Sequence, residues 1–375
     1  MSLDLERQKT VESVQRLTRT ATVASVKRDE QTIKDYQNQI YSSAKPKFTK
    51  ENVKNYMITR LTQLVPSKEI MRTNKRLINP IPGLKQVDRR QWYNIMVAFW
   101  CWSWDAYDFF TISLNITQLS EDLDVSVKSI TWGITLVLML RSIGAFVFGY
   151  YGDRYGRKYP LAVNMFLVTL LKIGTGFIKT YNEFLAVRSL FGILLGGVYG
   201  NATALALDDC PVDARGFVSG FVQQGYAFGY LMAVIFKRAI GDNSKYHWKA
   251  MYWFGAGVCF IIVVAILFAP ETKAYSRQKE VEAFNRKHHI EQLTFKQKAL
   301  RAIKCYWLVI IYMIFLMSGF NFMSHGTQDL YPTLLTVRYG YSNNRSTVTN
   351  CLANIGAFIG GILVGNFSNI FGRRI

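Results

Sequence analysis

From Trp92 onward the chain is divided into apolar runs of about 20 residues each. A helix rising about 1.5 Å per residue needs a run of this length to cross the roughly 30 Å hydrocarbon core of a bilayer. Eight such runs are predicted, at residues 92–119, 130–151, 158–178, 184–206, 216–236, 248–268, 304–330 and 346–370. The predicted fold class is therefore an all-α polytopic membrane protein.

The segment before the first run has a different composition. Residues 1–91 hold 19 of the 45 Lys and Arg but only 9 of the 25 Asp and Glu, and they are rich in Ser, Thr and Gln. Without sustained apolar periodicity, we expect a basic, largely disordered tail. Residues 53–64 could form a short surface helix or stay solvated.

Loop charge sets the expected orientation. The tail, the loop at 152–158 and the loop at 269–303 are basic and fall on one side, which we expect to be the cytoplasm. The basic segment 237–249 falls on the other side and counts against this scheme. Basic loops also explain the net charge of +20 better than nucleic-acid binding does, so no nucleic-acid partner is expected.

A short loop motif occurs twice. Gly149, Asp153, Arg154, Gly156 and Arg157 belong to the pattern G-x-x-x-[D/N]-x-x-G-R-[K/R] after the second run, and the pattern returns after the eighth. Asn369 takes the acidic position in the second copy. Glycines suit the unusual backbone angles of a tight turn, which predicts a structural role for the motif.

This motif resembles the loop between spans two and three of the major facilitator superfamily. Arg188-x-x-x-Gly192-x-x-x-Gly196 and Pro270-Glu271-Thr272 extend the resemblance over about 92–375. It implies twelve spans in two six-helix halves around a midplane site. Residues 92–268 would form the N-terminal half, 269–303 the cytoplasmic loop between the halves, and 304–375 an incomplete C-terminal half. Four spans would then be missing, as in a fragment.

Two carboxylates lie inside the Trp-rich first run. Asp105 and Asp108 are three residues apart and share one helical face. An ionised Asp at mid-bilayer costs at least roughly 2.5–3.5 kcal/mol, so both should face a cavity or a partner. Because desolvation favours the neutral form, either could exchange a proton near neutral pH. We favour proton coupling over an ion pair with Arg141 or Arg188.

Two arginines lie inside later runs. The fork of Arg141, in the second run, would suit a substrate carboxylate or one of the two Asp residues, and both interpretations stay open. Arg188, in the fourth run, matches an arginine common in proton-coupled facilitators, and a structural role stays open as well.

The seventh run carries a polar face. Asn321, His325 and Asp329 follow the helical spacing i, i+4, i+8. Such a face suits an aqueous cavity, and imidazole titrates in the physiological range. The alternative interpretation is that these polar residues form the solvated outer end of a helix. The pattern N-x-x-[S/T]-H-x-x-Q-D-x-x-x-T resembles the Jen-type fungal lactate permeases of the sialate–proton symporter branch, and every specified position is matched, by Asn321, Ser324, His325, Gln328, Asp329 and Thr333.

The resemblance implies symport of protons with lactate, pyruvate or acetate, or with malate or succinate, across the plasma membrane. The residues predicted to bind substrate are Arg141, Asn321, Ser324, His325, Gln328 and Thr333. Those predicted to couple protons are Asp105, Asp108, His325 and Asp329. The predicted structural residues are Gly149, Asp153, Arg154, Gly156, Arg157 and Arg188.

Alternative functions are transport of another solute, such as a sugar or phosphate, and nutrient reception without net flux. An enzyme is not expected, because no soluble segment is large enough for a catalytic core. Neither a cofactor nor a metal ion is expected. The expected partners are a small carboxylate, H⁺, the lipid bilayer and regulators of the N-terminal tail.

Overall fold

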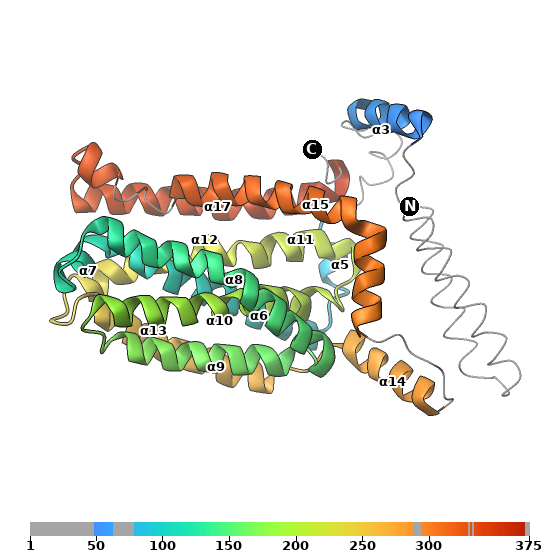
Figure 1. The fold of residues 1–375 in the computed structure, drawn as a ribbon, viewed down its shortest axis with the longest axis horizontal. Helices are drawn as coiled ribbons and strands as arrows, with labels where there is room; N and C mark the ends of the chain where they lie inside the picture. Colours follow the sequence, from blue (N-terminus) through green and yellow to red (C-terminus); the bar gives the residue numbers. More distant parts are fainter. Residues whose placement is uncertain (1–48, 63–78, 288–294, 329–330, 332–333, 372–375) are drawn as a thin grey trace, which may run out of the picture. The chain divides into compact units, whose positions relative to one another are not determined.

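The computed structural model describes residues 49–62, 79–287, 295–328, 331 and 334–371. All regular elements in this described part of the chain are helical, and Figure 1 shows their order. The helices are α3 (Lys50–Thr62), α5 (Ile81–Leu84), α6 (Arg89–Leu114), α7 (Ile116–Asp122), α8 (Val127–Tyr155), α9 (Lys158–Thr175), α10 (Tyr181–Leu207), α11 (Val212–Gln223), α12 (Gly225–Phe236), α13 (Trp248–Phe268), α14 (Lys273–Lys287), α15 (Phe295–Gln328) and α17 (Asn343–Phe371). Two π-helical turns follow α12 and precede α17, η2 (Lys237–Gly241) and η3 (Leu334–Arg338).

The chain divides into two compact units. One unit consists of Met1–Thr59 and Val281–Phe322, and the other of Arg60–Glu280 and Met323–Ile375. All candidate site residues that the structure describes lie in the second unit, except Asn321. This division follows packing, and the expected membrane domains at 92–268 and 304–375 stay predictions.

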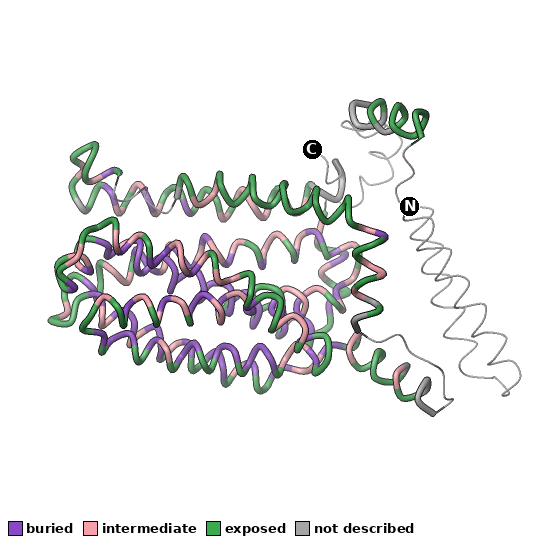
Figure 2. Tube along the Cα trace, viewed as in Figure 1, coloured by how far each residue is buried: buried purple, intermediate pink, exposed green. Residues whose placement is uncertain are grey.

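Helix α6 is the core of the second unit. It packs against α10, α11, α12 and α13, and most of its side chains from Ile95 to Ser113 are buried. The helices around α6 form a bundle. Figure 2 shows buried residues gathered inside this bundle and exposed residues on its outer faces. Large apolar side chains cover these outer faces, for example Phe146 on α8 and Ile261 on α13, as expected for helices in contact with lipid.

Five helices are long and apolar enough to cross a membrane, judged on the described residues alone. They are α8, α10 and α13, together with Ala299–Thr327 in α15 and Asn344–Phe367 in α17. The other three predicted spans coincide with α6, with α9 and with the pair α11–α12. Tryptophans and two carboxylates make α6 less apolar, so the count of eight spans stays a prediction.

Two predicted runs are broken in the structure. The run at 92–119 is interrupted at Asn115, between α6 and α7. The side-chain amide of Asn115 donates to the carbonyl oxygen of Thr111 at 2.7 Å and so competes with regular helix hydrogen bonding. The run at 216–236 is interrupted at Gln224, where one backbone N–H is shared between the carbonyls of Gly220 and Phe221.

Candidate functional site

Helix α6 places two carboxylates inside the bundle. Asp105 and Asp108 are each only 1% exposed. Their helix is fixed to α13, because the indole of Trp104 donates to the carbonyl oxygen of Gly255 at 3.0 Å and the hydroxyl of Tyr107 donates to that of Met251 at 3.0 Å. The predicted shared face is therefore turned toward neighbouring helices.

Asp105 is paired with Arg141 of α8. A guanidinium nitrogen of Arg141 lies 2.8 Å from the Asp105 carboxylate, and the arginine side chain is 18% exposed whereas that of Asp105 is fully buried. The sequence left a substrate carboxylate or one of the two Asp residues as the partner of Arg141, and in the structure this partner is Asp105. The ring of Phe109, one turn further along α6, lies 5.7 Å from the guanidinium carbon.

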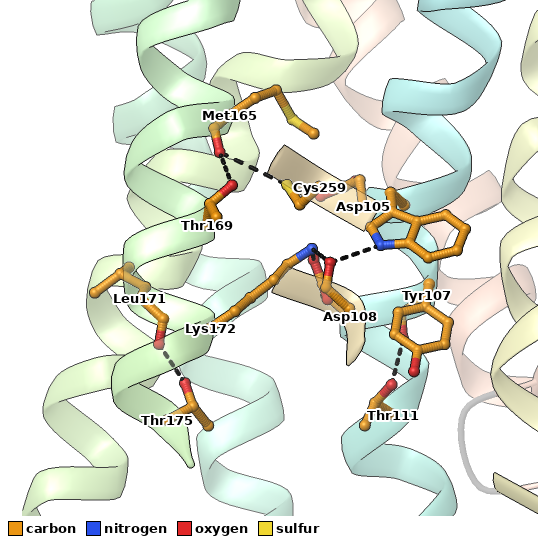
Figure 3. A network of polar contacts seen from close by, with 12 residues as sticks. Asp105, Tyr107, Asp108, Thr111, Met165, Thr169, Leu171, Lys172, Thr175 and Cys259 are labelled. Atoms are coloured by element: carbon orange, nitrogen blue, oxygen red, sulfur yellow. Dashed lines mark hydrogen bonds and ion pairs between the residues drawn. The ribbon is translucent and has the colours of Figure 1, made fainter. Parts of the chain in front are cut away.

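Asp108 is paired with Lys172 of α9, a residue that the sequence analysis missed. The Lys172 ammonium lies 2.6 Å from the Asp108 carboxylate, and both side chains are buried. Figure 3 shows Lys172 reaching across from its helix toward Asp108. A lysine inside a predicted span was itself the signal, since intramembrane charges are rare and call for a partner.

Arg188 of α10 forms no ion pair among the described residues. It is completely buried, and none of its three guanidinium nitrogens has a hydrogen-bond partner in the described part of the chain. Its guanidinium carbon lies 5.2 Å from the centre of the Phe191 ring. Of the two arginines predicted as alternative ion-pair partners for the carboxylates, Arg141 pairs with Asp105, whereas Arg188 pairs with neither carboxylate.

His325 of α15 lies beside the first pair. Its ring is 5.5 Å from that of Phe109, edge to face, and 6.3 Å from that of Tyr226 on α12. Since Phe109 also contacts Arg141, one phenyl ring links the histidine to the guanidinium. Of the predicted polar face, His325 therefore lies near the buried charges of α6.

The other residues of that face include one half-buried and one exposed side chain. Ser324 is half-buried, while Asn321 is exposed and donates its amide to the carbonyl oxygen of Met317, on its own helix, at 2.8 Å. The side chain of Gln328 lies outside the described residues, as do Asp329 and Thr333.

The repeated loop motif forms the junction between α8 and α9. Gly156 ends α8 with a φ of 92°, which favours glycine. The backbone N–H groups of Arg157 and Lys158 donate to the Glu271 carboxylate at 3.2 and 3.3 Å. The Tyr275 hydroxyl donates to the Arg154 carbonyl oxygen at 3.3 Å.

Charged side chains strengthen the same junction. Arg157 lies 2.8 Å from the Asp153 carboxylate and 3.7 Å from that of Asp208. Burial raises the pKa of the Asp208 carboxyl, although Arg157 opposes that shift. Gly149 lies in the last turns of α8 with open space around it. In the second motif copy, the Asn369 side chain and residues 372–374 lie outside the described part.

Comparison with known proteins shows which family this chain matches. A family model described as Major Facilitator Superfamily matches residues 85–375. The "Carboxylic acid transporter protein homolog" of Saccharomyces cerevisiae is 35% identical over 342 residues, which cover 88% of this chain and 55% of that protein. The "Probable 4-methylmuconolactone transporter" of Cupriavidus pinatubonensis is 24% identical over 292 residues, which cover 74% of this chain and 64% of that protein.

A solved structure shows the same fold. The proton:xylose symporter XylE bound to 6-bromo-6-deoxy-D-glucose matches with a TM-score of 0.58 at 19% identity, covering 76% of this chain and 70% of that one. The chain spans less than two thirds of the length of the two curated relatives.

Proposed function

Because this chain belongs to the Major Facilitator Superfamily, whose members are transporters and not enzymes, we propose that it is part of a proton-coupled carboxylate symporter. It would work by alternating access in the plasma membrane, with the N-terminal tail in the cytoplasm. Its substrates would be short monocarboxylates such as lactate, pyruvate and acetate, or dicarboxylates such as malate and succinate.

The observation that carries the proposal is the pair of buried carboxylates on α6. Asp105 and Asp108 are each held by a cation from a different helix, Arg141 of α8 and Lys172 of α9. A buried carboxylate that loses its partner is strongly favoured to become neutral. Proton uptake at α6 is thereby coupled to the release of a cation on a neighbouring helix.

The released cation provides the link to the substrate. When Asp105 takes up a proton, Arg141 is free to hold a carboxylate by two parallel hydrogen bonds. Arg141 suits this role because its side chain is partly exposed, in contrast to the Asp105 side chain. The name of the yeast relative, a carboxylic acid transporter homolog, supports an acid as the substrate.

Energetics explain why a proton should accompany the anion. At a membrane potential of −100 mV, an anion that enters the cell meets an opposing free energy of about 2.3 kcal/mol per charge. One proton carried with a monocarboxylate cancels this term and adds any inward pH gradient.

The polar face of the seventh run would complete the site. We assign substrate binding to Asn321, Ser324, His325, Gln328 and Thr333, and proton transfer to His325 and Asp329. The contact between Phe109 and His325 supports this assignment, because it brings the imidazole near Arg141. The α8–α9 junction, with its glycine turn and charged contacts, would keep the ends of these helices in register during the transport cycle.

The test is uptake of radiolabelled lactate and succinate by cells that express the complete protein, at about pH 5 and about pH 7. We expect saturable uptake that rises at the lower pH and falls when an uncoupler removes the proton gradient. Absence of uptake of both acids, at verified surface expression, would contradict the proposal and favour another solute or a receptor.

A further inference from the structure

The bundle around α6 contains a surplus of buried positive charge. Among its described residues, Arg141 and Lys172 each contact a carboxylate, whereas Arg188 contacts none. Asp108 lies within electrostatic range of Arg188, but its carboxylate is engaged with Lys172 at 2.6 Å. Three cations therefore share two carboxylates.

An unpaired guanidinium at such depth is costly. Arg188 has no exposed surface, and buried charges in proteins are normally paired and hydrogen-bonded. Inside a membrane helix, an ionisable side chain of this kind marks a substrate or ion pathway. The missing counter-charge must be an anion, since the group that seeks a partner is cationic and only donates hydrogen bonds.

The surroundings of Arg188 define which anion fits. Phe191 covers one face of the guanidinium at 5.2 Å, so that its edges remain for hydrogen bonds. Tyr252 of α13 lies within electrostatic range of Arg188, and its buried hydroxyl also lacks a hydrogen-bond partner among the described residues. A planar guanidinium fork and a buried hydroxyl donor are the groups that suit the two oxygens of a carboxylate.

We propose that Arg188 and Tyr252 form a subsite that binds the carboxylate group of the transported acid. Arg188 shares the carboxylate with Arg141, because the two oxygens of a carboxylate can accept about four hydrogen bonds, and Tyr252 donates to one of these oxygens. The inference rests on the proposed function and gives Arg188 a role in substrate binding in addition to the structural role expected from the sequence. A neutral sugar would leave the surplus charge uncompensated, so the subsite selects anions.

The test is equal-pH exchange of radiolabelled lactate, acetate and succinate in proteoliposomes that contain the complete protein. Exchange without a pH gradient reports substrate binding apart from net proton coupling. We expect Arg188→Lys, which keeps the charge but loses the planar fork, to raise KM about tenfold or more with a smaller effect on the maximal rate. Tyr252→Phe should raise KM about fivefold.

The matched control is Arg238→Lys. Arg238 lies in η2, its side chain is 57% exposed, and it pairs with Asp242 at 3.3 Å, so KM should stay unchanged. An unchanged KM in both Arg188→Lys and Tyr252→Phe would overturn the subsite. A purely structural Arg188 would lower thermal stability without raising KM in the molecules that still exchange.

Two further outcomes are distinguishable. If the wild-type protein exchanges none of the three acids, the proposed function fails together with the subsite. If the wild type exchanges an acid but Arg188→Lys does not fold, Tyr252→Phe becomes the test of the subsite. A raised KM and a loss of thermal stabilisation by the acid in Tyr252→Phe would support the subsite. Wild-type values of both quantities would reject it.

Discussion

At the residue scale, the contact between Asp108 and Lys172 places opposite charges 2.6 Å apart without solvent exposure. Removal of one partner leaves the other charge buried and uncompensated. We predict that Lys172→Met lowers the free energy of unfolding by about 3–5 kcal/mol. The double variant with Asp108→Asn should recover roughly half of this loss or more.

This prediction is checked by unfolding measurements in lipid–detergent micelles on the two single variants and the double variant. The double-mutant cycle isolates the interaction between the two side chains. Losses that simply add in the double variant would show that the two charges do not stabilise each other.

Asp105 provides a second prediction at this scale. Asp105→Asn replaces the carboxylate by a neutral amide of similar shape, which imitates the protonated state and frees Arg141. We expect the variant to retain equal-pH exchange of the acid but to lose acid-stimulated accumulation. Asp242→Asn, on an exposed residue, is the control and should behave as wild type. Accumulation that still rises at low pH in Asp105→Asn would assign coupling to another group.

At the scale of elements, the turn between α8 and α9 depends on Gly156. Its φ of 92° is unfavourable for any residue with a side chain, and an added Cβ would approach the Glu271 carboxylate that caps α9. We predict that Gly156→Ala costs about 1–2 kcal/mol and lowers the thermal midpoint by a few degrees. Gly149→Ala, where the structure leaves open space, should leave the midpoint unchanged or raise it. Equal midpoints for both variants would contradict a strained turn.

The same junction predicts a pH dependence. Burial raises the pKa of the Asp208 carboxyl in the folded protein, so its ionised form opposes folding. This unfavourable contribution is present above the folded-state pKa and disappears as the pH falls through the unfolded value. We expect acidification to stabilise Asp208→Asn less than wild type over that range, as measured by thermal unfolding at stepped pH. A wild-type pH profile in the variant would exclude the carboxyl as its source.

At the scale of the whole molecule, α17 docks on the bundle through glycines. A Cβ added at Gly365 would meet backbone atoms of Gly220 and Gly216 on α11, so the two helices approach as closely as small-residue contacts between membrane helices allow. We predict that Gly365→Val separates them and lowers the transport rate about tenfold or more. Gly360→Val on the same helix, where nothing lies within 4 Å, is the control. Wild-type rates in Gly365→Val would show that this contact is dispensable.

The sequence determined the fold class and several members of the candidate site. Apolar runs long enough to cross a bilayer predicted helices, and helices are what the described residues form. Asp105 and Asp108 were predicted to share a face because their spacing matches the helical period, which is a local property. Gly156 was predicted to occupy a turn, since its motif combines glycines with charged residues, and the structure gives it a positive φ.

Only the tertiary structure decided which groups meet. Arg141 had two candidate partners in the sequence, and the packing of α8 on α6 selected Asp105. Lys172 pairs with Asp108 because α9 lies where its ammonium reaches that carboxylate. Arg188 has no ion pair within the described part of the chain, although the sequence allowed one. The physical reason is that helical periodicity fixes the face of a residue on its own helix, whereas partner choice depends on the rotation and neighbours of whole helices, which contacts distant in sequence establish together.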